Sequence, residues 1–231
     1  MARKAASDHT RSVTPSCFIV GAGPGIGQSC ARAFADEGHD VALIARRPQR
    51  LQEAARELRQ ASGRRIETYA ADAASETSLL GALEAASADL GAPSVLIYNA
   101  ASAQLGKPTT IPVERLIEDF RVNVAGALVA ARTVAPGMVA RGQGTILFTG
   151  GGSAYEPAAD YAALSLGKAA LRSLTYTLAQ ELGRSGVHVG MVTVYGFVQA
   201  GTHFDPDLIA QSYLKLHRQP KGHFDIEAVY R

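Results

Sequence analysis

Short apolar runs alternate with longer helical stretches along almost all of the 231 residues, and this alternation constrains the fold more than any other feature. Apolar runs of about four to eight residues predict buried strands, and apolar residues three or four apart predict helices. The predicted strands are 17–20, 41–45, 66–70, 95–98, 145–149, 187–194 and 224–230. The predicted helices are 26–37, 49–61, 76–90, 113–141, 157–183 and 206–217. Pro136 is expected to interrupt the helix that contains it.

Helices of about ten or more residues between successive strands require crossover connections, which place the strands parallel and bury both faces of the sheet. The chain shows no repeat, low-complexity linker or composition break that would mark a second domain. We therefore predict one α/β domain over residues 16–231, a Rossmann-type doubly wound parallel sheet of about seven strands with helices on both faces. Residues 1–15 are predicted to be a flexible tail.

Composition excludes several classes of partner. The 23 basic and 21 acidic residues leave a net charge of +2, so no nucleic-acid partner is expected. Cys17 and Cys30 form no disulfide framework, and neither they nor the six histidines have the spacing of metal ligands, so we expect a reducing compartment and no metal. Residues 1–16 lack the apolar core of a secretory signal, and no apolar run approaches the ~20 residues that span a bilayer. We predict a cytoplasmic protein without a membrane segment.

A glycine-rich turn joins the first predicted strand to the first predicted helix. It reads Gly-Ala-Gly-Pro-Gly-Ile-Gly over residues 21–27. Glycine permits positive φ and lets the backbone approach a pyrophosphate, and the helix N-terminus offers N–H groups and a partial positive charge. This context predicts a dinucleotide site, with the following candidate cofactor-binding residues: Gly21, Gly23, Gly25, Ile26 and Gly27.

The spacing G-x-x-x-G-x-G resembles the turn of the short-chain dehydrogenase/reductase family, with Val20 in place of the usual threonine. Further family motifs follow in order. They are Asp72 after the third strand, Asn99 in a Tyr-Asn-Ala-Ala version of the family's N-N-A-G, Asn123 in a helix, Lys168 in Gly-Lys-Ala-Ala-Leu, and Val198 after Tyr195-Gly196, where the family has a P-G turn beside the nicotinamide. The resemblance implies that Asp72 contacts adenine and that Asn99, Lys168 and Val198 also bind the cofactor.

Arg46 and Arg47 follow the second predicted strand, where an acidic residue would select NAD by accepting hydrogen bonds from the ribose 2′-hydroxyl. Guanidinium groups there favour a 2′-phosphate through charge-assisted hydrogen bonds. We therefore predict NADP(H) over NAD(H). The alternative is that both arginines are solvated residues that open a basic helix continuing through Arg50, Arg56 and Arg59.

The resemblance implies a catalytic set that is incomplete in this chain. In the family, a tyrosine four residues before the lysine transfers the proton, a serine thirteen residues earlier polarises the substrate oxygen, and the asparagine holds a proton-relay water. Asn123 and Lys168 are present, but Leu164 and Gly151 occupy the tyrosine and serine positions. Tyr161 lies one turn before Leu164 on the helical face of Lys168 and is the candidate replacement; the alternative is an ordinary amphipathic residue. Ser153, Tyr155 and Ser165 are weaker candidates.

Three functions remain open from the sequence. The first is an NADP(H)-dependent oxidoreductase of short-chain dehydrogenase/reductase type, acting on an unknown carbonyl or alcohol, with Asn123, Lys168 and Tyr161 as catalytic residues. The second is a non-catalytic NADP(H)-binding sensor or regulatory protein, because of Gly151 and Leu164. The third is a scaffold without ligand. The resemblance also implies a homodimer or homotetramer formed through the two long helices.

Overall fold

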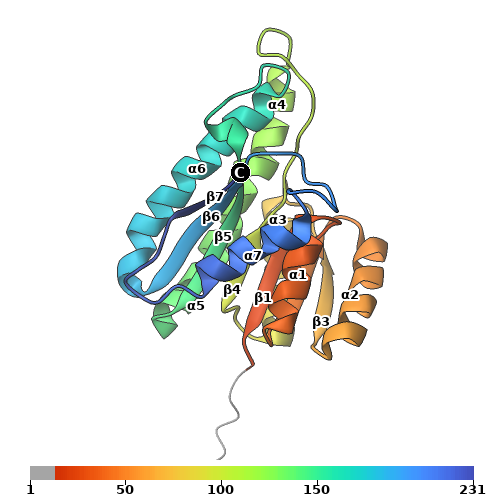
Figure 1. Cartoon of the computed structure of the whole chain (residues 1–231), viewed down its shortest axis with the longest axis vertical. Coiled ribbons are helices and arrows are strands. Elements are labelled where there is room, and N and C mark those ends of the chain that lie inside the picture. The colour runs from red at the N-terminus through yellow and green to blue at the C-terminus, as the bar shows by residue number, and fades with distance from the viewer. Residues whose placement is uncertain (1–13) are drawn as a thin grey trace, which may run out of the picture.

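Seven parallel strands form one sheet in the order β3-β2-β1-β4-β5-β6-β7 in the computed structural model, which describes residues 14–231 (Figure 1). The strands are β1 (Ser16–Val20), β2 (Asp40–Ala45), β3 (Ile66–Ala70), β4 (Val95–Tyr98), β5 (Gly144–Gly151), β6 (Val187–Val194) and β7 (Glu227–Tyr230). The predicted α/β class and strand number are confirmed. The predicted tail lies outside the described residues except for its last two positions.

Helices cover both faces of the sheet. They are α1 (Ile26–Asp36), α2 (Pro48–Ser62), α3 (Glu76–Leu90), α4 (Val113–Phe120), α5 (Gly126–Arg141), α6 (Ala162–Leu182) and α7 (Pro206–His217). One apolar core joins α3, α5 and α6 to one face, and a second core joins α1, α2 and α7 to the other, with α7 lying across the sheet beside α1 (Figure 1). This layering confirms the doubly wound arrangement.

The strand order reverses at β1, which pairs with β2 on one side and with β4 on the other. The connections that follow β1 and β4 lead to helices on opposite faces of the sheet. A crevice therefore opens between the loops at the carboxyl ends of these two strands. In open α/β sheets, ligands bind at such a switch point. The glycine-rich turn follows β1 directly, so the fold places it at this crevice.

The long helix predicted over 113–141 is continuous through Pro136, and the prediction of a break there is wrong. The regular α-helix instead changes at a π-helical turn over Arg121–Ala125, between α4 and α5. Tyr98 from β4 explains part of this change, because its hydroxyl donates to the carbonyl of Val122 at 2.5 Å. A side chain from a central strand thus satisfies a carbonyl within the π-turn, a contact that helical periodicity does not encode.

Two other boundaries differ from the prediction by three residues or more. Helix α6 begins at Ala162 and not at residue 157, because the preceding segment pairs with the β4–α4 loop: Gly106 donates to the carbonyl of Asp160, and Ala162 donates to that of Gly106. The last strand begins at Glu227 and not at residue 224. Tyr161 therefore lies at the N-cap of α6, outside its regular turns.

The continuous helical segment Val113–Arg141 is long and apolar enough to cross a membrane by length and composition, contrary to the expectation that no such segment exists. Half of its most apolar window is buried inside the protein. Alanine and valine side chains of α5 pack into the core on the sheet. Its apolar composition is therefore explained by packing within an α/β fold.

A histidine cluster occupies the opposite edge of the sheet, near the amino ends of β2, β5 and β6. The His39 and His217 rings lie 5.4 Å apart, and Thr145 Oγ1 shares a hydrogen bond of 2.9 Å with His217 Nδ1. Burial lowers the pKa of His39 and of His188. Burial, followed by the neighbouring His39 and His188, lowers the pKa of His217 to about 4.

This cluster predicts a loss of stability in mild acid. The unfolded chain protonates His217 near its ordinary pKa of 6.5, whereas the folded protein resists protonation until about pH 4, so stability falls as the pH drops through this window. His217 alone is expected to cost about 2 kcal/mol of unfolding free energy between pH 7.5 and pH 5. Urea unfolding at the two pH values measures this loss, and His217→Gln should remove that part of it. An equal loss in the variant would contradict the assignment to His217.

Candidate functional site: a nucleotide crevice beside a buried lysine

Two glycines of the turn after β1 are required by close packing. Gly21 has φ +85°, and a Cβ there would lie 2.4 Å from the Ala100 backbone nitrogen. A Cβ on Gly27, in the first turn of α1, would lie 2.3 Å from the Gly21 carbonyl oxygen. These contacts bring α1 against the end of β1, so the free N–H groups of its first turn face the crevice at short range.

The middle of the turn is open. Gly25 has φ +95° and precedes α1, and neither Gly23 nor Gly25 would bring a Cβ within 4 Å of another atom. Bare backbone at these two positions leaves room for a group that approaches the N-terminus of α1. Pyrophosphate has the charge and the acceptor oxygens that this geometry favours.

A cavity of about 530 Å³ extends from the turn along the ends of β1, β2 and β4. Six of the predicted cofactor-binding residues line it: Gly21, Gly23, Arg46, Arg47, Asp72 and Asn99. Gly25, Ile26 and Gly27 shape the start of α1 without lining this cavity, and Lys168 and Val198 lie outside its wall. Val198 is in the loop after β6, 41% exposed.

The cavity wall near β2 is basic at one end. Arg46, Arg47 and Arg50 line it, and within residues 14–231 none of them forms an ion pair with a carboxylate. Arg50 was not predicted as a ligand, although its position in the first turn of the helix that follows Arg46 and Arg47 is the signal that would have placed it here. Glu53 and Glu57 line the wall one and two turns further along α2.

Asp72 lines the cavity, and the resemblance to the family implies that it contacts the adenine of the cofactor. Its Oδ1 accepts a hydrogen bond from the Ala74 backbone nitrogen at 3.0 Å, which fixes the turn between β3 and α3. The second carboxylate oxygen keeps its capacity to accept a hydrogen bond from a ligand.

Thr149, near the end of β5, joins the turn to the lysine through hydrogen bonds. Its Oγ1 donates to Asn99 Oδ1 at 2.8 Å, and Asn99 Nδ2 donates to the Gly21 carbonyl at 2.9 Å. Lys168 Nζ donates to the Thr149 carbonyl at 2.6 Å, and the buried Tyr213 hydroxyl lies 2.6 Å from Thr149 Oγ1. Thr149 was missed by sequence reasoning, because no local pattern marks a threonine that connects three distant segments.

Lys168 is 7% exposed, and burial lowers its pKa to about 8. Its stem runs past the end of β5, where a Cβ on Gly151 would lie 3.6 Å from Lys168 Cε. That is ordinary van der Waals distance, so packing does not force glycine at this position. Lys168 thus presents a buried, positively charged amine near the nucleotide crevice.

Asn123 lies in the π-turn and is 1% exposed. Its Oδ1 accepts from the Ser102 backbone nitrogen at 2.8 Å, and its Nδ2 donates to the Ser102 carbonyl at 3.0 Å. The side-chain amide therefore fixes the loop after β4. A Cβ on Gly167 would lie 2.8 Å from Asn123 Cβ, so the residue before Lys168 packs directly on Asn123.

Tyr161 is the N-cap of α6, seven residues before Lys168, and is partly buried. Leu164 lies between them and is also partly buried. Tyr161 pairs with Gly106 of the β4–α4 loop, whose start is held by Asn123. Tyr161, Asn123 and Lys168 thus come from adjoining segments. Of the weaker candidates, Tyr155 uses its hydroxyl in hydrogen bonds with Glu227 and Arg172, and Ser165 Oγ accepts from the Ala158 backbone nitrogen.

An elongated crevice at the switch point, bare glycine backbone at a helix N-terminus and a cationic far wall define an α/β protein with the geometry of a dinucleotide site. Residues 16–205 match the family described as short chain dehydrogenase, and the chain belongs to this family.

Related proteins extend this assignment to nearly the whole fold. A metagenomic short-chain oxidoreductase in complex with NADP superposes with a TM-score of 0.85 at 29% identity, covering 93% of this chain and 96% of the other. A short-chain dehydrogenase from Sphingobium yanoikuyae in complex with NADPH gives 0.81 at 26% identity, covering 93% and 87%. An uncharacterized oxidoreductase of Staphylococcus aureus (strain N315) is 27% identical over 213 residues, covering 88% of this chain and 90% of the relative.

Proposed function

We propose that the protein is an NADP(H)-dependent oxidoreductase that interconverts a carbonyl compound and the corresponding alcohol. The observation that carries this proposal is the continuous set of contacts from the glycine turn through Asn99 and Thr149 to Lys168. It couples the expected pyrophosphate position to a buried amine at the expected reaction centre. The two related structures that hold NADP or NADPH support the same cofactor here.

The residues of the crevice fit this cofactor part by part. Gly21, Gly23 and Gly25 suit the pyrophosphate, and Arg46 suits the 2′-phosphate, with Arg47 in support. Asp72 suits the adenine end, whereas Lys168 and Val198 suit the nicotinamide end. When bound, NADPH would supply the hydride for the carbonyl carbon and would be left as NADP⁺.

We assign the accompanying proton to Tyr161. The hydroxyl group donates a proton to the substrate oxygen during reduction and takes it back during alcohol oxidation. The cationic Lys168 binds ribose hydroxyls and stabilises the tyrosinate that remains after proton donation. Asn123 holds the loop at Ser102, and its role in a proton relay stays a prediction.

The non-catalytic alternative keeps the same cofactor and dispenses with the proton transfer, because Leu164 and Gly151 offer none. Two measurements separate the functions. NADPH binding with NADPH oxidation on a panel of aldehydes and ketones supports the oxidoreductase. Binding without turnover across the panel would favour the sensor, and absence of binding would favour the scaffold.

Arg46→Ala is expected to raise the Kd for NADPH about 10- to 100-fold, because charge-assisted hydrogen bonds to the 2′-phosphate are worth roughly 1.5–3 kcal/mol. NADH lacks this phosphate, so its Kd should change little. Fluorescence titration with each cofactor measures both values. Arg56→Ala is the matched control, because Arg56 is on α2, the helix that follows Arg46, but lies outside the cavity wall. An equal effect of Arg46→Ala on both cofactors would contradict the assignment.

A homodimer or homotetramer and a cytoplasmic location stay predictions. Exposed apolar side chains on α4, α5 and α6 support association of the long helices: Val113, Ile117, Phe120, Leu128 and Leu166. Sedimentation equilibrium of the purified protein gives the oligomeric state directly.

A further inference from the structure

Two tyrosine rings lie next to each other beyond the carboxyl edge of the sheet, outside the nucleotide cavity. Tyr155 belongs to the loop after β5, and Tyr195 follows β6. Their ring centres are 6.0 Å apart, and the ring planes are inclined by 34°. The resemblance to the family implies a proline at the position of Tyr195, so the ring at this position is a departure from the family's usual residue.

Adjacent glycines connect this ring pair to the proposed reaction centre. A Cβ on Gly151 would touch the Lys168 stem at 3.6 Å, whereas a Cβ on Gly152 would lie 2.7 Å from a ring carbon of Tyr195. The Lys168 side chain therefore packs near Gly151, and the Tyr195 ring packs against the next residue, Gly152. The ring of Tyr195 packs on bare backbone, so Gly152 is required for its position.

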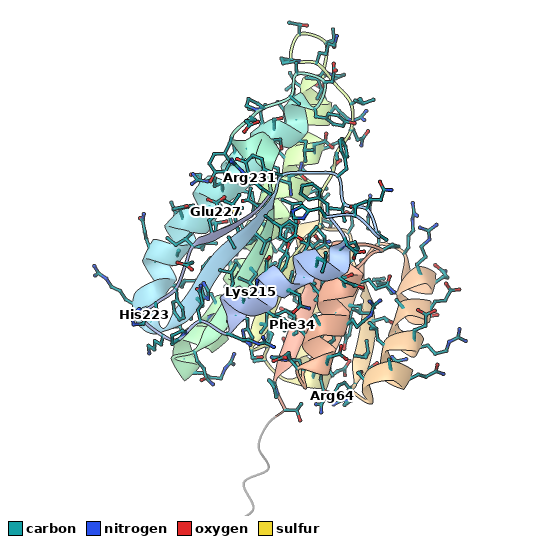
Figure 2. All side chains as sticks on the ribbon, viewed as in Figure 1. Phe34, Arg64, Lys215, His223, Glu227 and Arg231 are labelled. Atoms are coloured by element: carbon teal, nitrogen blue, oxygen red, sulfur yellow. The ribbon has the colours of Figure 1, made fainter. Side chains whose placement is uncertain are left out.

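Charged side chains contact both rings. The Tyr155 hydroxyl donates to Glu227 Oε2 at 2.6 Å, and Arg172 Nε lies 2.9 Å from the same carboxylate oxygen. The Arg172 guanidinium is 4.6 Å from the centre of the Tyr155 ring, and the Arg231 guanidinium is 4.2 Å from that of Tyr195. Glu227 begins β7 and Arg231 follows its last residue, and Figure 2 labels both on this edge strand.

The network fixes Tyr155 by its hydroxyl while leaving 43% of its surface exposed, and the Glu227 side chain that anchors it is 6% exposed. An exposed aromatic ring that is already ordered loses little conformational entropy when a ligand stacks on it. The arrangement therefore has the properties of a preformed binding wall.

We propose that Tyr155 and Tyr195 form one wall of the substrate site and that the substrate is a planar aromatic carbonyl compound or the corresponding alcohol. This inference rests on the proposed oxidoreductase function, because it deepens the substrate class of the same site. Offset or edge-to-face contacts between aromatic rings favour a flat π-system over a saturated ring of similar size, by up to about tenfold in affinity.

Matched pairs of compounds test the proposal with two independent readouts. Turnover compares benzaldehyde with cyclohexanecarboxaldehyde by NADPH oxidation. Binding compares benzyl alcohol with cyclohexylmethanol by saturation-transfer NMR titration, in the presence of NADP⁺ and without it. The wild-type protein is expected to prefer the aromatic member about tenfold in kcat/KM and in Kd.

Variants assign the preference to the ring pair. Tyr195→Leu should reduce it to less than about twofold, whereas Tyr195→Phe should retain an aromatic preference because the ring remains. Tyr155→Leu is a second route to the same result if Tyr195→Leu fails to fold, as judged by circular dichroism. Equal affinities for the two alcohols, or a preference that both leucine variants leave unchanged, would overturn the proposal. Aromatic-selective binding without turnover of either aldehyde would instead contradict the oxidoreductase function and leave the aromatic wall supported.

Discussion

Tyr161→Phe is expected to lower kcat for carbonyl reduction by about 10²- to 10⁴-fold, which is the usual contribution of a positioned general acid. The substitution removes one hydroxyl oxygen from the start of α6 and keeps the ring, so the fold should be preserved. Because the tyrosine donates the proton and does not hold the nucleotide, the Kd for NADPH should stay nearly constant. Single-turnover NADPH oxidation and fluorescence titration measure the two quantities.

Tyr69→Phe is the matched control. Its hydroxyl hydrogen-bonds to Asp89 at the β3 edge of the sheet, far along the strand order from β5 and α6. We expect no change in kcat for this variant. If Tyr161→Phe retained full turnover, the proton would have to come from another group, and the assignment of Tyr161 would be wrong.

Substitutions in the glycine turn are expected to separate folding from cofactor binding. Gly21→Ala places a Cβ 2.4 Å from a backbone atom at φ +85°, so it should cost roughly 2–5 kcal/mol of unfolding free energy through strain and overpacking. Gly23→Ala meets no protein atom within 4 Å, so the fold should be retained. Its methyl group would meet the bound pyrophosphate, and the Kd for NADPH should rise about 10- to 100-fold.

Urea unfolding and NADPH titration of the two variants provide the test. Gly81→Ala, on the exposed side of α3, is the control and should stabilise the protein by roughly 0.5–1 kcal/mol without affecting NADPH. If Gly23→Ala bound NADPH as tightly as the wild-type protein, the pyrophosphate would not lie against this part of the turn.

Local patterns in the sequence were sufficient for the architecture. Buried parallel strands appear as continuous apolar runs, and amphipathic helices repeat every three to four residues, so the seven strands and the covering helices could be predicted from composition and spacing. The glycine turn could be located for a similar reason. Positive φ at Gly21 and Gly25 and close packing at Gly27 leave few alternatives to glycine.

Boundaries that depend on distant partners could not be predicted. The helix continues through Pro136, and its irregular turn lies at Asn123, where Tyr98 and the Ser102 backbone supply hydrogen bonds from other segments. Likewise, α6 starts at Ala162 because the β4–α4 loop pairs with the residues before it. Neither event leaves a periodic signal, because each depends on a few contacts between segments that are distant in the sequence.

The sequence by itself determined the fold class, the position of the nucleotide turn and the identity of the candidate residues Arg46, Asp72 and Lys168. Only the tertiary structure showed that Thr149 joins this turn to Lys168 and that the rings of Tyr155 and Tyr195 lie next to each other. The physical reason is the separation along the chain over which each interaction acts. Backbone preference and burial act between near neighbours in the chain, whereas a binding site is assembled from side chains that meet only after the sheet has formed.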